Sequence, residues 1–300
     1  MKKLSVVLAA ALLCGIFTGC EKPVFDEGEE PVVGGEVMNP DKCKNFKFTL
    51  KGDFGGWDNG VTRGYMSADG KDMTDLWVFD FMGGECVQSL HQESSTAGDA
   101  WGCPSLALAY GSHHVYFAVS RGASPVVDND AHTITWSTVS DTFWKDYEVS
   151  VVSTSNGNRA VTLDRVVTKL KVTATDEVPV GCATVTITPA VWYYGLNYMT
   201  GAAINPANTA RTVSVPESYI GTTGELSVSI YGMSGASEWT TDFTVTARDG
   251  NNAVIGSATV TGAPFKRNRA TEYSGCLFGS GGQTDVSLNS AWDTPTTGTW

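Results

Sequence analysis

Strict alternation of apolar and polar residues over short runs constrains the fold of this chain more than any other feature of its sequence. The run 46–51 (FKFTLK) alternates at every position, and similar runs recur between clusters of Gly, Asn, Asp and Pro. Segment 76–81 (LWVFDF) is apolar almost throughout, as expected of a strand that is covered on both faces. No segment keeps a 3.6-residue apolar period over three turns. The pattern predicts an all-β chain folded into antiparallel β-sandwiches.

Strands are expected along the whole chain after its first 45 residues. In residue numbers they include 46–51, 76–81, 115–119, 132–136, 147–152, 166–172, 185–187, 213–215, 226–230, 243–247, 254–260, 273–278 and 286–288. This amounts to roughly six to eight strands in each half, which is enough for one sandwich per half.

Length and turn composition predict two domains. A chain of 300 residues is longer than one core ordinarily holds. The stretch 153–159 (STSNGNR) is the most polar, turn-rich segment near the middle. We therefore predict a leader at 1–19, a tether at 20–43, an N-terminal sandwich at 44–157 and a C-terminal sandwich at 158–300.

The chain begins with the features of a secretory leader. Two lysines precede an apolar run, 4–17, that is too short to span a bilayer as a helix. The leader ends at 17–20 (FTGC), which resembles a bacterial lipobox, although Phe17 stands where Leu is usual. The resemblance implies that Cys20 receives a diacylglycerol and anchors the protein in the outer membrane. The alternative is a plain signal peptide in which Cys20 is an ordinary residue.

An acidic segment follows Cys20. Five acids lie within the next ten residues, and residues 21–42 contain three prolines and few large apolar groups. Such a segment buries too little surface to fold, so it is expected to be a solvated tether. It also resembles the surface-export signal of Bacteroidetes lipoproteins, which implies an outward-facing protein.

Charge and motifs exclude several classes of function. The net charge is −12, and removal of the leader with its two lysines lowers it to −14. No basic block is present, which argues against a nucleic-acid partner. The sequence contains no catalytic or nucleotide-binding motif, so we expect neither an enzyme nor a cofactor. His113 and His114 are adjacent in an expected strand and point to opposite faces, so no metal site is predicted.

The cysteines after the lipobox are odd in number. They are Cys43, Cys86, Cys103, Cys182 and Cys276, so at least one thiol remains unpaired. Two interpretations stay open: a disulfide between Cys86 and Cys103, or five free thiols.

The densest aromatic cluster is 192–198 (WYYGLNY). Burial in the second domain is one interpretation. The other is a ligand-facing patch formed by Trp192, Tyr193 and Tyr194, because exposed aromatic side chains commonly mark binding surfaces.

Several motifs, taken in order, resemble a known family. They are the lipoprotein leader, a short strand (FKFTLKG), a Thr-Arg in a Gly-rich loop (GVTRG), a strand DLWVFDFMGGE, the mid-chain LDRVVTKLKV, and the late segments FKRNRATEYSGCLFG and VSLNSAWD. Over nearly all of the mature chain this order is similar to the fimbrillin superfamily of Bacteroidales, the subunits of type V pili. The resemblance implies two tandem, transthyretin-like Greek-key sandwiches at the outer surface that serve pilus assembly and adhesion.

The resemblance also implies an assembly mechanism. Polymerising fimbrillins are cut by an Arg-specific protease in the loop after the first strand, which here points to cleavage between Arg63 and Gly64. The first strand and the lipid then leave, and a strand from the next subunit pairs with the opened groove. The C-terminal segment is the expected donor strand, with Val286, Leu288 and Trp292 as its pocket-filling side chains. Anchor subunits of the family keep both strand and lipid, so a permanent strand 46–51 is the alternative.

A second function remains open at this stage. A surface lipoprotein that binds glycans for nutrient uptake has a similar leader and β-rich composition. It would expose aromatic side chains around Trp192 and exchange no strand.

Overall fold

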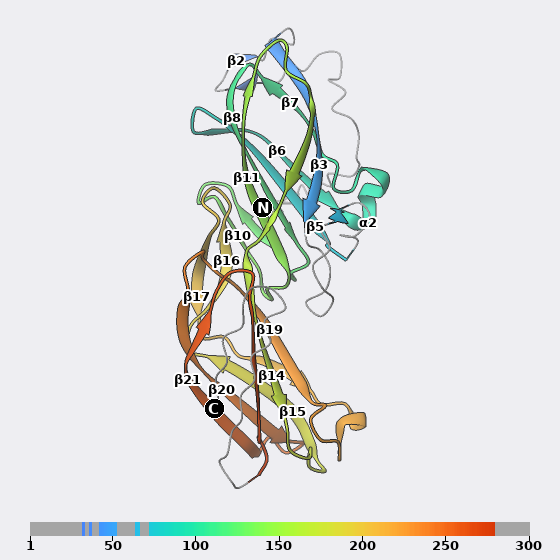
Figure 1. Cartoon of the computed structure of the whole chain (residues 1–300), viewed down its shortest axis with the longest axis vertical. Coiled ribbons are helices and arrows are strands. Elements are labelled where there is room, and N and C mark those ends of the chain that lie inside the picture. The colour runs from blue at the N-terminus through green and yellow to red at the C-terminus, as the bar shows by residue number, and fades with distance from the viewer. Residues whose placement is uncertain (1–31, 34–35, 38–41, 53–63, 67–71, 280–300) are drawn as a thin grey trace, which may run out of the picture.

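The computed structural model describes residues 32–33, 36–37, 42–52, 64–66 and 72–279. These residues form β-sheets stacked into two parts that lie end to end, with a four-stranded sheet at their junction (Figure 1). No helix among the described residues combines the length and apolarity needed to cross a membrane.

The first part is a sandwich of two main sheets. One has the order β13-β11-β8-β5-β6, and the other has the order β12-β3-β4 with β7 also paired to β3. The bounds of the strands and short helices are β1 (Val32–Val33), β2 (Glu36–Val37), β3 (Cys43–Gly52), β4 (Gly64–Tyr65), β5 (Asp75–Met82), β6 (Glu85–Glu93), α2 (Ser94–Ala97), η2 (Gly98–Ala100), β7 (Ser105–Ala109), β8 (Gly111–Ser120), β11 (Thr142–Val151), β12 (Asn158–Thr162) and β13 (Asp164–Arg165). Strands β1 and β2 pair only with each other among the described residues.

The core of the first sandwich follows from the alternation in the sequence. The inward-facing side chains of β3 are fully buried; they are Phe46, Phe48 and Leu50. Asn45, which precedes them, and Lys47, which lies between the two phenylalanines, are exposed. They pack with side chains of β8, such as Phe117, in one apolar cluster. Burying one such side chain stabilises a fold by about 1.5–3 kcal/mol, so the alternation fixes which face of β3 turns inward.

The second part is a sandwich of a three-stranded and a four-stranded sheet. Their orders are β19-β14-β22 and β18-β15-β20-β21. The bounds are β14 (Val167–Ala174), β15 (Cys182–Pro189), β18 (Arg211–Ser214), η3 (Glu217–Tyr219), β19 (Ser227–Met233), β20 (Trp239–Asp249), β21 (Val254–Phe265) and β22 (Ala270–Gly275). Leu170, Ile187 and Phe243 are among the buried residues of its core.

A separate four-stranded sheet joins the two parts. Its order is β17-β16-β10-β9, with β9 (Val126–Asp128) and β10 (Thr133–Thr135) from the first half of the chain and β16 (Trp192–Asn197) and β17 (Ala202–Ala207) from the second. A third apolar cluster lies at this junction and includes Phe79, Trp136, Leu196 and Tyr198. The two sandwiches therefore share both backbone hydrogen bonds and a core.

Strand β5 explains the continuous apolar run in its sequence. Leu76 and Val78 belong to the core of the first sandwich, whereas Trp77, Phe79 and Phe81 belong to the junction cluster. Because successive side chains point to opposite faces, a strand between two cores is apolar at nearly every position. The prediction that segment 76–81 is covered on both faces is confirmed.

The predicted all-β sandwich fold class is confirmed. Most strand pairs are antiparallel, but β12 pairs with β3 and β14 pairs with β22 in parallel. The expected strand 286–288 lies outside the described residues.

The predicted domain boundary at residue 157 stays a prediction. Segment 153–159 connects β11 to β12, and β12 pairs with β3 of the first sandwich. Strand β13 likewise pairs with β11. A polar turn marks a connection within a sandwich as readily as a connection between domains, so composition alone does not separate the two cases.

Candidate functional site

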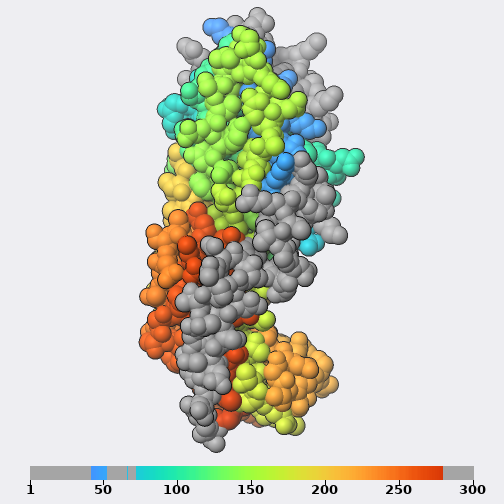
Figure 2. All heavy atoms as spheres, viewed as in Figure 1, coloured from blue at the N-terminus to red at the C-terminus, as the bar shows by residue number. Residues whose placement is uncertain are grey.

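Strand β3 lies in the interior of its sheet rather than at an edge. On one side it pairs in parallel with β12, and on the other it pairs antiparallel with β7. Neighbouring loops add backbone bonds: Phe48 N donates to Pro104 O at 2.9 Å, and Leu50 N donates to Gly102 O at 3.1 Å. In Figure 2 the atoms of β3, in blue, reach the surface beside yellow-green atoms of the β12 region. Withdrawal of β3 would leave a groove with unpaired backbone groups on both walls.

Aromatic contacts fill the pockets under β3. The ring of Phe48 meets the edges of Phe117 and Tyr147, with centroids 5.2 and 5.9 Å away. The guanidinium of Arg159, on β12, lies 5.0 Å from the centroid of the Phe46 ring. Edge-on aromatic pairs and cation–π contacts each add about 0.5–1.5 kcal/mol beyond burial. Large apolar side chains at alternate positions of β3 therefore fill these pockets.

Gly157 permits the close approach of β12 to β3. Lys47 N donates to Gly157 O at 2.7 Å. A Cβ at position 157 would lie 2.0 Å from the carbonyl oxygen of Asn45. Only glycine fits here, because any side chain would push the parallel pair apart.

Most of the predicted assembly residues lie outside the described residues. These are Cys20, Arg63, Val286, Leu288 and Trp292. Gly64 is described as the first residue of β4, and it pairs with Gly52 at the end of β3. From Gly64 onward, the described chain is therefore paired with the end of β3.

The aromatic cluster 192–194 is only partly accessible. Trp192 is buried, with its indole N–H donating to Tyr231 O at 2.8 Å and its ring 5.0 Å from that of Phe265. Tyr193 and Tyr194 are half-buried. Burial raises the pKa of Tyr194, whose hydroxyl donates to Thr209 O at 2.9 Å. Trp192 is thus a core residue of the second sandwich, and the two tyrosines are the members that reach the surface.

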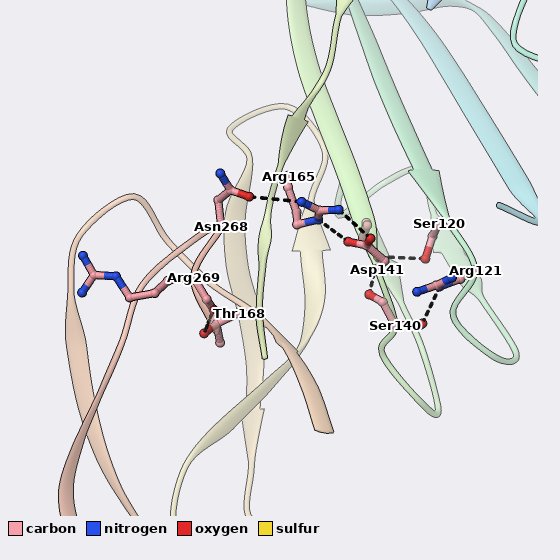
Figure 3. Close-up of polar contacts among 9 residues, drawn as sticks. Ser120, Arg121, Ser140, Asp141, Arg165, Thr168, Asn268 and Arg269 are labelled. Carbon is pink, nitrogen blue, oxygen red and sulfur yellow. Dashed lines mark hydrogen bonds and ion pairs between the residues drawn. The ribbon is translucent and has the colours of Figure 1, made fainter. Parts of the chain in front are cut away.

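A buried ion pair lies at the junction of the sandwiches (Figure 3). The Nε and Nη2 atoms of Arg165 donate to the two oxygens of Asp141 at 2.6 and 2.9 Å, and both side chains are 1% exposed. The guanidinium also lies 4.6 Å from the centroid of the Phe143 ring. Its Nη1 donates to Oδ1 of Asn268, in the turn between β21 and β22, at 3.3 Å. One arginine of the first sandwich therefore binds the last turn of the second.

Further polar contacts surround this ion pair. Thr168 Oγ1 donates to Arg269 O at 2.9 Å, and Asn268 N donates to Val167 O at 2.8 Å. Figure 3 shows Arg165 and Asn268 facing each other across the junction, whereas the side chain of Arg269 points away from them. Arg165 lies within the sequence motif LDRVVTKLKV, but the motif does not predict an ion pair. Its partner Asp141 is distant in the sequence, and no motif there indicates a buried carboxylate.

A second buried pair lies on β5 and β8. His113 Nδ1 is 2.7 Å from Asp80 Oδ1, its Nε2 is 2.9 Å from Ala109 O, and neither side chain is exposed. Both partners of the imidazole are acceptors, so the geometry fits a doubly protonated, charged histidine. Burial by itself lowers the pKa of His113, but the hydrogen bond and charge of Asp80 raise it above the ordinary value of 6.5.

Two exposed groups combine a histidine with carboxylates. They are Asp75, His91 and Glu93 on β5 and β6, and His114, Asp146 and Glu148 on β8 and β11, each with ligand atoms within 4.8 Å of one another. The sequence predicted no metal site, and it correctly separates His113 from His114, which point to opposite faces. The second group arises from cross-strand pairing of β8 with β11, which sequence reasoning did not supply.

No disulfide joins Cys86 to Cys103 in the structure, and Cys182 and Cys276 form none either. Burial raises the pKa of Cys86 and of Cys182, which keeps these thiols protonated and weakly nucleophilic.

The fold is that of a two-sandwich protein in which β3 completes the first core. Residues 123–299 match the model of a family of unknown function, DUF6562, and the chain belongs to this family. The match begins just before β9 and so includes every strand of the junction sheet. No curated protein sequence matches the chain.

Several solved structures are similar to the chain at low sequence identity. A "putative adhesin" from Bacteroides ovatus has a TM-score of 0.48 and 12% identity, covering 72% of this chain and 77% of its own. The fimbrial anchor protein Mfa2 from Porphyromonas gingivalis has a TM-score of 0.43 and 9% identity, covering 74% and 83%. The tip fimbrial protein Mfa3 from the same species, truncated at its C-terminus, has a TM-score of 0.39 and 14% identity, covering 77% and 94%.

Proposed function

We propose that this protein is a surface-exposed, lipid-anchored fimbrial subunit that assembles by strand exchange and supports adhesion. The observation that carries the proposal is the placement of β3. It is an amphipathic strand near the N-terminus, paired on both sides, with Phe46, Phe48 and Leu50 fully buried. A strand of this kind is suited to replacement by an equivalent strand from another subunit, because a donor recovers the same hydrogen bonds and fills the same pockets.

The direction of assembly follows from the two ends of the chain. In this proposal Cys20 carries the lipid until an Arg-specific protease cuts between Arg63 and Gly64. The fragment that leaves includes β3, and the C-terminal segment of a neighbouring copy, with Val286, Leu288 and Trp292, enters the groove. Because the donor and the groove are different surfaces, the contact does not close on itself and produces a filament.

Treatment of the uncleaved full chain with an Arg-specific protease tests this proposal. We expect a new N-terminus at Gly64 and, on gels run without boiling, a ladder of oligomers that resists mild denaturation. Arg63→Ala should abolish both the new N-terminus and the ladder, whereas Arg211→Ala, an exposed change on β18 of the second sandwich, should still give the ladder. A ladder from the Arg63→Ala variant, or clean cleavage at Gly64 without oligomers, would contradict strand exchange.

A deletion of residues 284–300 tests the donor. The deleted chain should be cut normally but should remain monomeric. It should also cap added full-length cleaved protein, because it still presents a groove. If the deleted chain polymerises like the intact one, the C-terminal segment is not the donor.

A further inference from the structure

Three side chains that are able to bind a metal ion meet at one edge of the first sandwich. Asp75 is the first residue of β5, and His91 and Glu93 lie on β6, the last strand of that sheet. One ligand atom from each residue lies within 4.8 Å of the other two. The register places Glu93 directly opposite Asp75 and His91 opposite Trp77, so the three side chains share one face of the sheet.

Two of these side chains are carboxylates that face each other across the strand pair. Like charges directly opposite in an antiparallel pair are destabilising. Within the described part of the chain, neither Asp75 nor Glu93 forms an ion pair with a lysine or an arginine. A neutral imidazole between them compensates neither charge, whereas a divalent cation compensates both.

Two of the three side chains are held in position by other contacts. Asp75 Oδ1 lies 2.9 Å from His91 Nε2, and Asp75 Oδ2 accepts a hydrogen bond from Thr74 Oγ1 at 2.6 Å. The His91 ring stacks on the buried indole of Trp77, with centroids 5.1 Å apart and an angle of 2° between the planes. Contacts of this kind orient the ligands of metal sites. The exposed Glu93 is then the one ligand that has to adjust.

The donor atoms identify the class of cation. Zinc binds imidazole nitrogen and carboxylate oxygen at about 2.0–2.2 Å, so its tetrahedral ligands lie about 3.3–3.6 Å apart. Magnesium and calcium favour oxygen ligands alone. We propose that Asp75, His91 and Glu93 bind a first-row divalent transition metal such as Zn²⁺. The ion takes the lone pair of His91 Nε2, and the ring carries its proton on Nδ1.

Such an ion would connect β5 to the strand at the edge of the sheet. Three protein ligands leave one position of a tetrahedral zinc ion open to water or to a group on another molecule. An exposed edge strand is the part of a sheet that other chains pair with most readily. The metal would therefore hold β6 in its register at the edge where the sheet is least protected.

The similar group on β8 and β11 provides a matched comparison. There His114 lies directly opposite Glu148, so no two carboxylates face each other across the strands. Both oxygens of Asp146 lie near His114 Nδ1, at 3.1 and 3.2 Å, and no other hydrogen bond orients that carboxylate within the described part of the chain. The Asp146 side chain is also more exposed than that of Asp75, 29% against 14%. We expect this group to bind zinc more weakly.

A zinc titration of the uncleaved full chain tests the proposal, because binding requires no assembly. The protein is labelled with nitrogen-15 in its histidine rings, freed of metal with a chelator, and titrated with Zn²⁺ or Mg²⁺ up to about 1 mM. The ring signals of His91 and His114 are identified by their absence in His91→Gln and His114→Gln. We expect zinc to shift the Nε2 signal of His91 before it shifts His114, and we expect magnesium to shift neither. Zinc bound to thiols leaves these ring signals in place.

Variants then separate a metal site from an ordinary ion pair. Glu93→Gln should weaken zinc binding about tenfold or more, while its urea midpoint without metal should equal or exceed that of the unaltered protein, because one of two facing charges is removed. His114→Gln should bind zinc at His91 as the unaltered protein does. The proposal is wrong if zinc does not shift His91 by about 1 mM, if His114 responds at lower zinc than His91, or if Glu93→Gln binds zinc normally.

Discussion

At the scale of the residue, Asp141 and Arg165 carry opposite charges that are almost wholly removed from water. Desolvation of two charges is expensive, and it is offset here by two short hydrogen bonds, the Asn268 amide and the Phe143 ring. An intact pair of this kind contributes only modestly to the free energy of unfolding, because the desolvation cost offsets its attraction. Removal of Asp141 leaves the guanidinium charge of Arg165 buried without the carboxylate that neutralises it.

We therefore expect Asp141→Ala to lower the free energy of unfolding by about 3–5 kcal/mol. The matched control is Asp164→Ala, because Asp164 forms an ion pair with Lys145 at 2.9 Å that is largely exposed. The control should lose about 1 kcal/mol or less, since solvent screens an exposed pair. Urea unfolding followed by tryptophan fluorescence measures both. Equal losses in the two variants would mean that the buried pair has no special role.

The His113–Asp80 pair predicts a pH dependence of stability. The pKa of His113 is raised in the folded state above its usual 6.5, so the folded protein holds this proton more tightly than the unfolded chain. The resulting stability is fully present below about pH 6.5 and is lost as the pH rises through the folded pKa. We expect the urea midpoint to fall over this range.

Two histidine variants isolate the source of that dependence. His113→Gln should be less stable at pH 6 and should lose most of the decline in urea midpoint above pH 6.5. His114→Gln, at the adjacent and half-exposed position, should keep it. A decline that persists in His113→Gln would assign it to another group.

Among the elements, β3 precedes the other strands of the first sandwich in the sequence, and it is hydrogen-bonded to a neighbour on both of its sides. It precedes the rest of the first sandwich, yet β12, from more than 100 residues later, supplies one of its neighbours. The first core is therefore closed late along the chain, and loop-closure entropy opposes that closure. Gly157, at the entry to β12, controls how closely the two strands meet.

Gly157→Ala should lower the free energy of unfolding by about 1–3 kcal/mol, because the added Cβ overlaps the carbonyl oxygen of Asn45. Gly235→Ala is the control, since a Cβ there meets nothing within 4 Å. The variant should also release β3 more readily, so amide exchange at Phe48 and Leu50 should become faster. A stability equal to that of the control would show that β12 adjusts without loss.

At the scale of the whole molecule, the junction makes the two sandwiches one mechanical unit. The shared sheet, the buried ion pair and the junction cluster together connect residues from both halves. Tyr198 is central to the cluster: it is fully buried, stacks on Phe79 with centroids 3.9 Å apart, and accepts the Trp144 indole N–H at its carbonyl at 2.7 Å.

This predicts a single cooperative thermal transition for the intact protein. Tyr198→Ala removes a buried aromatic side chain, which ordinarily costs about 3–5 kcal/mol. We expect calorimetry of this variant to resolve two transitions, one for each sandwich. Tyr219→Ala, at the half-buried margin of the second core, should shift one transition slightly without splitting it. Two transitions in the unaltered protein would mean that the halves are not coupled.

The local sequence pattern predicts the fold class, and it predicts which face of each strand is buried. Alternation at Phe46, Phe48 and Leu50 predicts which side chains enter the core, and the continuous run in β5 predicts cover on both faces. The candidate site was less accessible to sequence reasoning. Trp192 was included in an exposed aromatic patch as one of two alternatives, and it is buried. Trp136 directly follows β10, and its indole N–H has no hydrogen-bond partner among the described residues. Nothing in the sequence singles it out, because a lone tryptophan beside a strand looks like any core residue.

Three properties can be read from residues that lie close together in the chain. These are the β-rich character, the face of each amphipathic strand that turns inward, and the positions of a lipobox-like cysteine and an arginine on either side of the first strand. The placement of β3 between β7 and β12, the pairing of β10 with β16 and the contact of Asp141 with Arg165 become visible only in the folded protein. These contacts join segments that are far apart in sequence. Which of these long-range contacts form depends on the whole fold, because the favoured arrangement buries apolar surface and at the same time pairs buried charges and backbone groups. A local sequence pattern does not contain this information.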